Sequence, residues 1–314
     1  MSQQFYIVVN QVIMFAVLML IGFVMAKAGV LGNDVLNGLS KLIVKLLLPC
    51  LIFHLIIGNG VTIQRIWDNR YFAAALLLMY GILCLLGYAM GGASGLRRSG
   101  QDIFAVATMF CNIGFMGLPL IESMFPNNTQ IAVCLLIYMT LDQILLWSVG
   151  VFLSGRNAKR KGNSWLQNFL NPSLVGIAIA LALLYFNISL PAPVTNAVLG
   201  LGECSRYLAL LYLGALLATM PVLSMLMKPH VYFLIVLKMT LLPLLGYFLT
   251  SLFFDATTSR LLATILSLPP MVAITMIART YGGDERVAAE TVFVSTIACL
   301  GTIPLVQFLL GILF

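Results

Sequence analysis

The chain has 314 residues, of which 61% are hydrophobic and only 9% are charged, and its mean hydropathy is +1.05. Soluble domains carry about 25% charged residues, so this composition excludes an ordinary water-facing surface, and most of the surface must face lipid. The net charge of +7 is spread over short gaps between apolar runs rather than over a basic face with interleaved aromatics. That pattern argues against nucleic acid as a partner.

The apolar runs predict ten transmembrane helices, because about 20 apolar residues cross the hydrocarbon core of a bilayer. The first run has no positive residue before it and is long for the core of a signal peptide, so we interpret it as a membrane helix. The predicted fold class is an all-α polytopic membrane protein. Its ten predicted spans are residues 5–26, 38–57, 71–91, 103–125, 130–153, 171–188, 197–220, 231–252, 260–279 and 287–313.

The positions of Lys and Arg predict the orientation, because cytoplasmic loops of membrane proteins carry an excess of both residues. With the N-terminus outside, the inner loops hold ten Lys and Arg and the outer loops hold three. We therefore expect a multi-pass protein of the plasma membrane with both termini outside and the basic loop at residues 156–161 in the cytoplasm.

The basic segment 156–170 divides the chain into residues 1–155 and 171–314, with five predicted spans in each half. Because five is odd, the second half must lie upside down relative to the first, which is the inverted-repeat plan of many transporters.

Predicted spans four and nine are interrupted near their middles. The fourth contains Gly114, Gly117 and Pro119, and the ninth contains Pro269 and Pro270. Proline removes a backbone N–H and clashes with the preceding turn, and glycine weakens a helix. Unwound backbone is tolerated in a membrane only where protein or a wet cavity satisfies it. We expect the two breaks to meet and form a small polar chamber whose half-helix N-termini suit an anion.

Several polar residues fall inside the predicted spans, where ionisable groups are costly and are therefore functional candidates. Asp142, next to Gln143, is either a coupling site for H⁺ or Na⁺ or a structural hydrogen bond. Glu203 and Arg206 share a helix face and form either an internal ion pair or a gate. Lys238 either extends to the cytoplasmic surface or holds a carboxylate. Thr275 lines the chamber or satisfies its own backbone.

The interrupted segments resemble a known family. Asn112 followed by Met116-Gly117-Leu118-Pro119-Leu120 is similar to the Asn-x-x-x-Met-Gly-Ile-Pro-Leu element of the auxin efflux carriers. Leu268-Pro269, Ala278-x-x-Tyr281, Thr302-Ile303-Pro304-Leu305 and the stretch from Lys41 to Pro49 also resemble this family. It includes the plant PIN exporters and bacterial carriers of the malate and malonate type.

The resemblance implies ten helices with a scaffold part and a transport part, crossing helices four and nine, alternating access and a homodimer. It also implies that Asn112 contacts the substrate. Pro270 departs from the polar residue that the plant proteins carry after the proline, which leaves the substrate open.

The sequence favours a secondary active transporter of a small organic anion, such as a carboxylate or an auxin-like acid. We expect no cofactor apart from a coupling H⁺ or Na⁺, and the bilayer as partner. The alternative is a membrane ligand sensor or scaffold that has a carrier fold and does not transport. The chain has no HExxH, P-loop or nucleophile-elbow motif and no CxxC pair, so we expect neither an enzyme nor a metal site.

Overall fold

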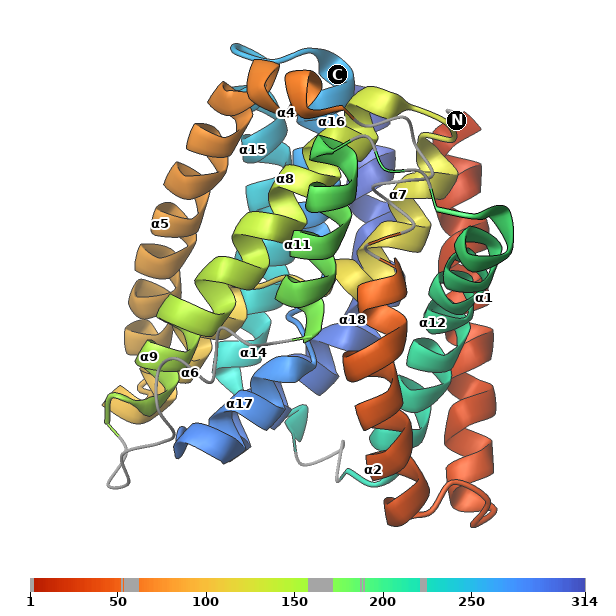
Figure 1. The fold of residues 1–314 in the computed structure, drawn as a ribbon. Helices are drawn as coiled ribbons and strands as arrows, with labels where there is room; N and C mark the ends of the chain where they lie inside the picture. The colour runs from red at the N-terminus through yellow and green to blue at the C-terminus, as the bar shows by residue number, and fades with distance from the viewer. Residues whose placement is uncertain are drawn as a thin grey trace.

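The computed structural model describes residues 3–51, 53, 62–157, 172–186, 188, 190–220 and 225–313. Within these ranges the chain is a bundle of helices, and its one extended pairing is an isolated antiparallel bridge between Cys111 and Pro270 (Figure 1). Lys159, Arg160 and Lys161 of the predicted basic loop lie outside the described residues.

The first half of the chain contains long helices, short helices and three π-helical turns. Its elements are α1 (Gln3–Lys27), α2 (Asn33–Leu42), η1 (Ile43–Leu47), α4 (Ile63–Asp68), α5 (Arg70–Ala93), α6 (Arg98–Met109), η2 (Ile113–Gly117), α7 (Leu118–Met124), α8 (Thr129–Leu145), η3 (Leu146–Gly150) and α9 (Val151–Gly155).

The second half follows a similar mixture. Its elements are α11 (Pro172–Tyr185), α12 (Ala192–Ala218), α14 (Pro229–Phe233), η4 (Leu234–Leu241), α15 (Leu242–Thr250), α16 (Ala256–Ser267), α17 (Ala273–Tyr281) and α18 (Glu285–Leu313). The turn after α17 depends on Gly282, whose φ of 79° lies in the left-handed region that favours glycine.

Six helices or helix runs are long and apolar enough to cross a membrane, which confirms a polytopic membrane protein. The other four predicted spans correspond to shorter pieces, namely α2 with η1, α6 with η2 and α7, α11, and α16 with α17. The count of ten spans and the inverted repeat therefore stay predictions. The six long segments are Phe5–Lys27, Arg70–Ala93, Thr129–Gly155, Ala192–Ala218, Pro229–Thr250 and Glu285–Leu313.

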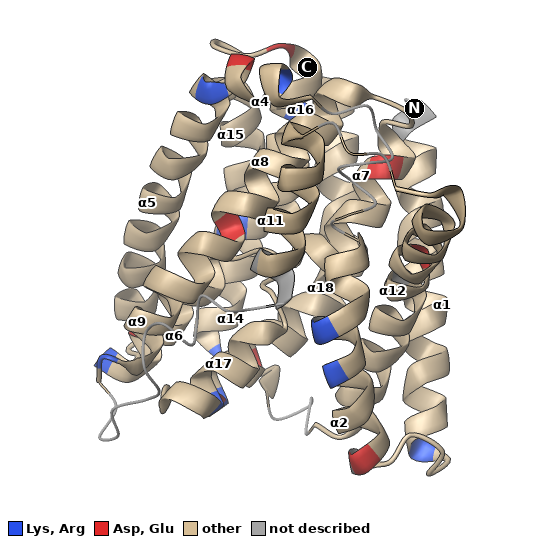
Figure 2. Cartoon of the chain, in the orientation of Figure 1, with Lys and Arg blue, Asp and Glu red and all other residues tan. Residues whose placement is uncertain are grey.

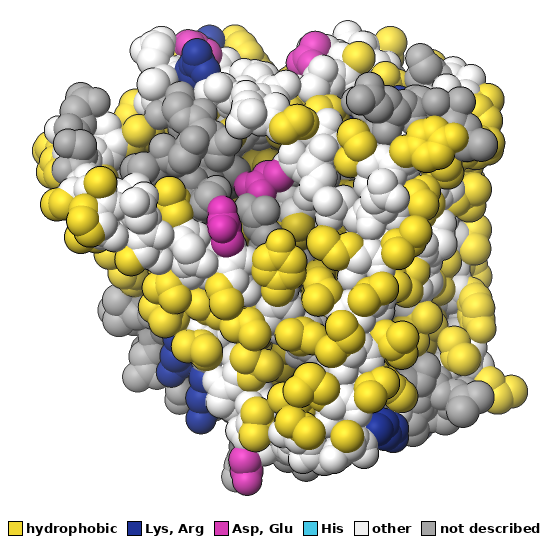
Figure 3. All heavy atoms as spheres, turned by 90° about the vertical axis from the view of Figure 1, so that its right-hand side faces the viewer, with side chains coloured by type: hydrophobic (Ala, Val, Ile, Leu, Met, Phe, Trp, Pro, Cys, Tyr) yellow, Lys and Arg dark blue, Asp and Glu magenta, His cyan; other side chains and the backbone are white. Residues whose placement is uncertain are grey.

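The surface of the bundle has the pattern of a lipid-facing protein. Figure 3 shows hydrophobic side chains spread over the face that carries α1 and α12. Ile13 and Leu20 of α1 are among the exposed hydrophobic residues of the chain. Lys and Arg lie at both ends of the bundle, with more of them toward the end opposite the chain termini, which we call the basic end (Figure 2). Both termini lie at the same end of the bundle, as the sequence predicts, and which side of the membrane that end faces stays a prediction.

Close helix packing holds α1 against α12. A Cβ atom at Gly22 of α1 would collide with the backbone carbonyl of Leu211, and one at Gly214 of α12 would collide with that of Met19. Small residues at such crossings let backbones approach closely, which is how helices associate in lipid, where burial of apolar surface gives no driving force.

Candidate functional site

Two extended segments meet at the centre of the bundle. After α6 the chain is extended at Phe110, and after α16 it is extended at Leu268. The Asn112 N–H donates to the Pro269 carbonyl at 2.8 Å, and the Met271 N–H donates to the Phe110 carbonyl at 2.9 Å. The two predicted interruptions are therefore real and adjacent, and each satisfies backbone groups of the other as a membrane interior requires.

The first break lies earlier in the chain than the proline pattern suggests. The helix ends at Met109, whereas Pro119 lies near the start of α7, directly after the π-helical turn η2. Pro269 and Pro270 do lie within the second break, where neither can donate a hydrogen bond. Pro119 therefore lies beyond the break, inside the half-helix that begins at Ile113, and the bridge from Cys111 to Pro270 marks the break itself.

Lys238 contacts both extended segments at the point where they meet, which we call the crossing. Its side chain is 1% exposed, and its ammonium group donates to the Leu268 carbonyl at 2.5 Å and lies 3.3 Å from Cys111 Sγ. The prediction that Lys238 extends to the cytoplasmic surface is therefore wrong. The ammonium stays buried because a break supplies a carbonyl with no helical partner, which a cation satisfies well.

A cavity of about 60 Å³ lies beside the crossing, at the N-terminal ends of the half-helix that begins with η2 and of α17. On this scale a water molecule needs roughly 10–15 Å³, so the cavity holds a few waters or a few non-hydrogen atoms of a ligand. Its walls are mostly apolar. The lining residues are Ser40, Ile43, Leu48, Asn112, Gly114, Phe115, Gln143, Leu146, Trp147, Tyr212, Met271, Val272, Ala273 and Met276.

Two buried donors of this cavity have no hydrogen-bond partner in the described part of the chain. They are Asn112 Nδ2, on a residue that is 1% exposed, and Trp147 Nε1. Buried polar atoms are normally paired, and a buried N–H left unpaired costs about 1–3 kcal/mol. Both residues line the same cavity, which makes their N–H groups the first candidates to donate to an acceptor bound there. Trp147 was missed by sequence reasoning, although it lies one helical turn after Gln143 and so shares its face.

Asp142 does not line the cavity itself but is next to Gln143, which does. It is fully buried, accepts a hydrogen bond from the Tyr80 hydroxyl at 2.7 Å and lies 3.4 Å from Gln143 Nε2. The Tyr80 ring packs against Phe110, the first residue of the extended segment, at 5.6 Å between centroids. The Gln143 amide therefore lies between the Asp142 carboxyl group and the cavity and connects the two.

The remaining predicted residues occupy different places. Gly117 leaves room for the Leu268 side chain, because a Cβ would lie 2.5 Å from Leu268 Cδ1. Thr275 donates to its own helix at the Val272 carbonyl, 2.8 Å away, and does not line the cavity. Glu203 is exposed on α12. The side chain of Arg206 lies outside the described part, so their ion pair stays a prediction.

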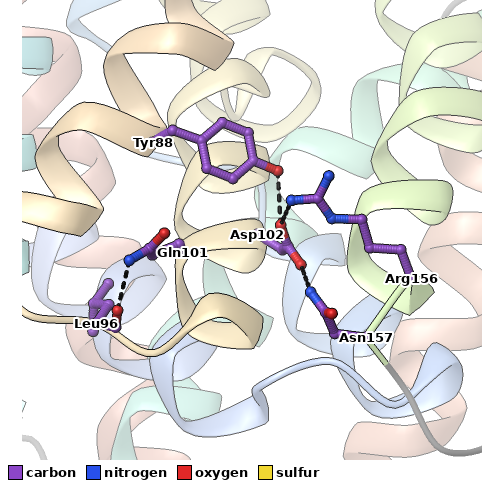
Figure 4. Close-up of polar contacts among 6 residues, drawn as sticks. All are labelled: Tyr88, Leu96, Gln101, Asp102, Arg156 and Asn157. Atoms are coloured by element: carbon purple, nitrogen blue, oxygen red, sulfur yellow. Dashed lines mark hydrogen bonds and ion pairs between the residues drawn. The ribbon is translucent and has the colours of Figure 1, made fainter.

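Sequence reasoning also missed a buried acid at the basic end of the bundle. Asp102 of α6 accepts hydrogen bonds from the Tyr88 hydroxyl at 2.8 Å, from Arg156 at 2.5 Å and from Asn157 (Figure 4). These partners join the ends of α5, α6 and α9. Nothing in the local sequence pairs residues more than 50 positions apart, so only the fold reveals this cluster, which we name the Asp102 cluster.

Comparison with known proteins identifies the family. The family model described as "Membrane transport protein" matches residues 7–164 and residues 159–307. An uncharacterized transporter of Schizosaccharomyces pombe is 25% identical over 146 residues, which span 41% of this chain and 32% of that protein. The matched part is therefore about a third of the length of that relative. Because the family model covers nearly the whole chain, this protein belongs to the membrane transport protein family, the family of the auxin efflux carriers.

Proposed function

We propose that the protein is a secondary carrier that moves a small organic anion by alternating access, with the anion bound in the cavity beside the crossing. The observation that carries this proposal is a pair of unpaired buried donors, Asn112 Nδ2 and Trp147 Nε1, on two residues that line one small cavity. An anionic oxygen accepts strong hydrogen bonds from such donors, because hydrogen bonds to charged groups contribute about 1.5–3 kcal/mol each.

The rest of the cavity supports a carboxylate with a short apolar body. The backbone N–H groups at the start of the half-helices around Gly114 and Ala273 add positive partial charge on one side. Leu48, Phe115 and Met276 give the other walls an apolar character. A cavity of about 60 Å³ admits only a few non-hydrogen atoms, so larger acids require the cavity to widen.

We also propose a proton as the coupling ion, bound by Asp142. An ionised Asp142 attracts the Gln143 amide 3.4 Å away. A protonated Asp142 releases that amide to the cavity, where it becomes a third donor for the anion. Proton and anion then favour each other's binding, and this reciprocity is what a symporter needs.

The test uses the purified protein in liposomes and a panel of radiolabelled mono- and dicarboxylates and aromatic acids. Asn112→Ala removes one charged hydrogen bond, so we expect an apparent affinity about 10- to 100-fold lower. Trp147→Phe keeps the ring but removes its N–H and serves as the matched second variant. Thr275→Ala is the control, because that hydroxyl is bonded to its own helix, and its flux is expected to equal wild type.

Three results would contradict parts of this proposal. Wild-type affinity in Asn112→Ala would remove the cavity as the binding site. Flux driven by a Na⁺ gradient and insensitive to a proton gradient would assign the coupling to Na⁺. Binding of an acid without accumulation or exchange would favour the alternative of a membrane sensor.

A further inference from the structure

A second group of ionisable side chains lies at the basic end of the bundle, away from the cavity. Glu290 of α18 lies 2.8 Å from Arg286 Nε, 3.4 Å from His230 Nε2 and 4.0 Å from Lys228 Nζ. The side chains of His230 and Glu290 are only 3% and 5% exposed, whereas those of Arg286 and Lys228 are 71% and 31% exposed. A buried imidazole and carboxylate therefore lie just beneath charges that reach water.

The elements packed around His230 define its electrostatic surroundings. The segment that starts α18 presents Glu290, Arg286 and Asp284, and Lys228 comes from the residue before α14. From α6 comes the uncharged ring of Phe104, edge-on at 5.7 Å. The nearest acid on α6 in sequence, Asp102, is held by Tyr88 of α5, Arg156 and Asn157. Among the described residues, Glu290 is thus the carboxylate in contact with His230.

The contact between the two groups needs a hydrogen atom. An imidazole nitrogen without hydrogen and a carboxylate oxygen are both acceptors, and two acceptors 3.4 Å apart repel each other. His230 Nε2 has no hydrogen-bond partner in the described structure. Neutral imidazole carries a hydrogen on only one of its two nitrogens, whereas the protonated ring carries one on both, so an added proton ensures a donor at Nε2 and gives it a charge that Glu290 attracts. Histidine is the side chain that gains or loses a proton between about pH 5 and 8.

We propose that His230 and Glu290 form a second proton-binding site, open to the aqueous side at the basic end and separate from Asp142. The exposed Arg286 and the partly exposed Lys228 mark the route by which water and protons reach the pair. A proton on His230 gives the ring a positive charge, so that its Nε2–H donates a charged hydrogen bond from α14 to Glu290 of α18. Proton binding itself is independent of the transport reaction, whereas its effect on transport rests on the proposed carrier function.

The site is connected to the crossing through one helical run. The run begins at Pro229 with α14 and continues into η4, so His230 and Lys238 lie about two turns apart. Lys238 donates to the Leu268 carbonyl of the second break. A proton that strengthens the contact between α14 and α18 therefore also stabilises the position of Lys238, which binds the second break. In this way the pH at the basic end changes how readily the crossing moves.

Proton binding is tested without any substrate. The chain has two histidines, so a His54→Gln variant leaves the imidazole of His230 as the one histidine signal in a labelled NMR sample. We expect this signal to titrate between about pH 5 and 8 and to shift its midpoint in Glu290→Gln. Arg286→Gln is the matched control, because it also contacts Glu290 but carries a charge that does not titrate in this range, and titration is expected to persist there. A signal that does not change over that range would overturn the proposal.

The effect on transport is tested in liposomes that accumulate one of the labelled carboxylates. In wild type, flux is expected to depend on pH at the basic side. In His230→Gln that dependence is expected to shrink by at least half, while dependence on the opposite side persists through Asp142. An unchanged pH profile in both His230→Gln and Glu290→Gln would overturn the link to transport. Absence of flux in every protein, wild type included, would count against the carrier function alone and leave the NMR result standing.

Discussion

Arg156→Gln is expected to destabilise the protein more than Asp102→Asn, although the two changes remove the same ion pair. Arg156→Gln leaves the buried Asp102 carboxylate with only Tyr88 and Asn157 as donors. Removing one partner of a buried pair costs about 3–5 kcal/mol because the other charge is left uncompensated. The Arg156 side chain is 41% exposed and its attraction is weakened by water, so we expect a cost below that range, about 2–3 kcal/mol.

Asp102→Asn is the milder change because the group left behind is different. Arg156 can turn to water, and the cost of keeping a carboxylate buried disappears together with its hydrogen bonds. We expect a net loss of about 1 kcal/mol, and the double variant is expected to be more stable than Arg156→Gln alone. Unfolding of detergent-solubilised protein by heat or SDS measures the order. Arg98→Gln, an exposed arginine at the same end, is the control and should change stability by less than about 0.5 kcal/mol. Equal or reversed costs for the two single variants would refute this reasoning.

Three further predictions concern packing, capping and the crossing. Gly214→Ala pushes a Cβ into a backbone carbonyl of α1 and is expected to cost about 1–3 kcal/mol in thermal unfolding, whereas Gly200→Ala on the same helix meets open space and should cost nothing. At Asp255, which caps α16, burial opposes the charged form but hydrogen bonds from the first turn outweigh it and lower the pKa. The ionised cap therefore stabilises the fold above about pH 4, and this stabilisation is lost as pH falls through the lowered pKa. Asp255→Ala should be less stable than wild type by about 1 kcal/mol at neutral pH and should not show this loss at low pH. Lys238→Met should fold, because the substitution removes the cost of keeping a charge buried. It should lose most transport, because the Leu268 carbonyl loses its donor. Unchanged flux would contradict the role of Lys238.

The sequence predicts those parts of the fold that depend on local composition. The apolar run from Phe5 to Ala26 corresponds to α1, which spans Gln3–Lys27, because its length alone determines that it can cross the bilayer. The meeting of the two breaks was also predicted from Pro269 and the matched glycine and proline pattern, since unwound backbone in lipid needs partners.

Other features depend on contacts that no local pattern encodes. Pro119 indicates an interruption but not its position, because the break lies several residues earlier and Pro119 follows the π-helical turn η2. The burial of Lys238 depends on a carbonyl 30 residues away in sequence. The His230–Glu290 pair joins residues 60 positions apart. Pairings of this kind appear only when the helices are placed in space.

The hydrogen bonds of the crossing explain why its unpaired donors matter. Three carbonyls of the extended segments have donors, since Phe110 pairs with Met271, Pro269 pairs with Asn112, and Leu268 pairs with Lys238. The break is therefore stable inside a membrane with no ligand to complete it. Against that background, the side-chain amide of Asn112 is an exception in a region where the backbone is otherwise satisfied. Folding alone would favour a side chain without the cost of a buried, unpaired donor, and this is the physical basis of the proposal that Asn112 binds a ligand in the cavity.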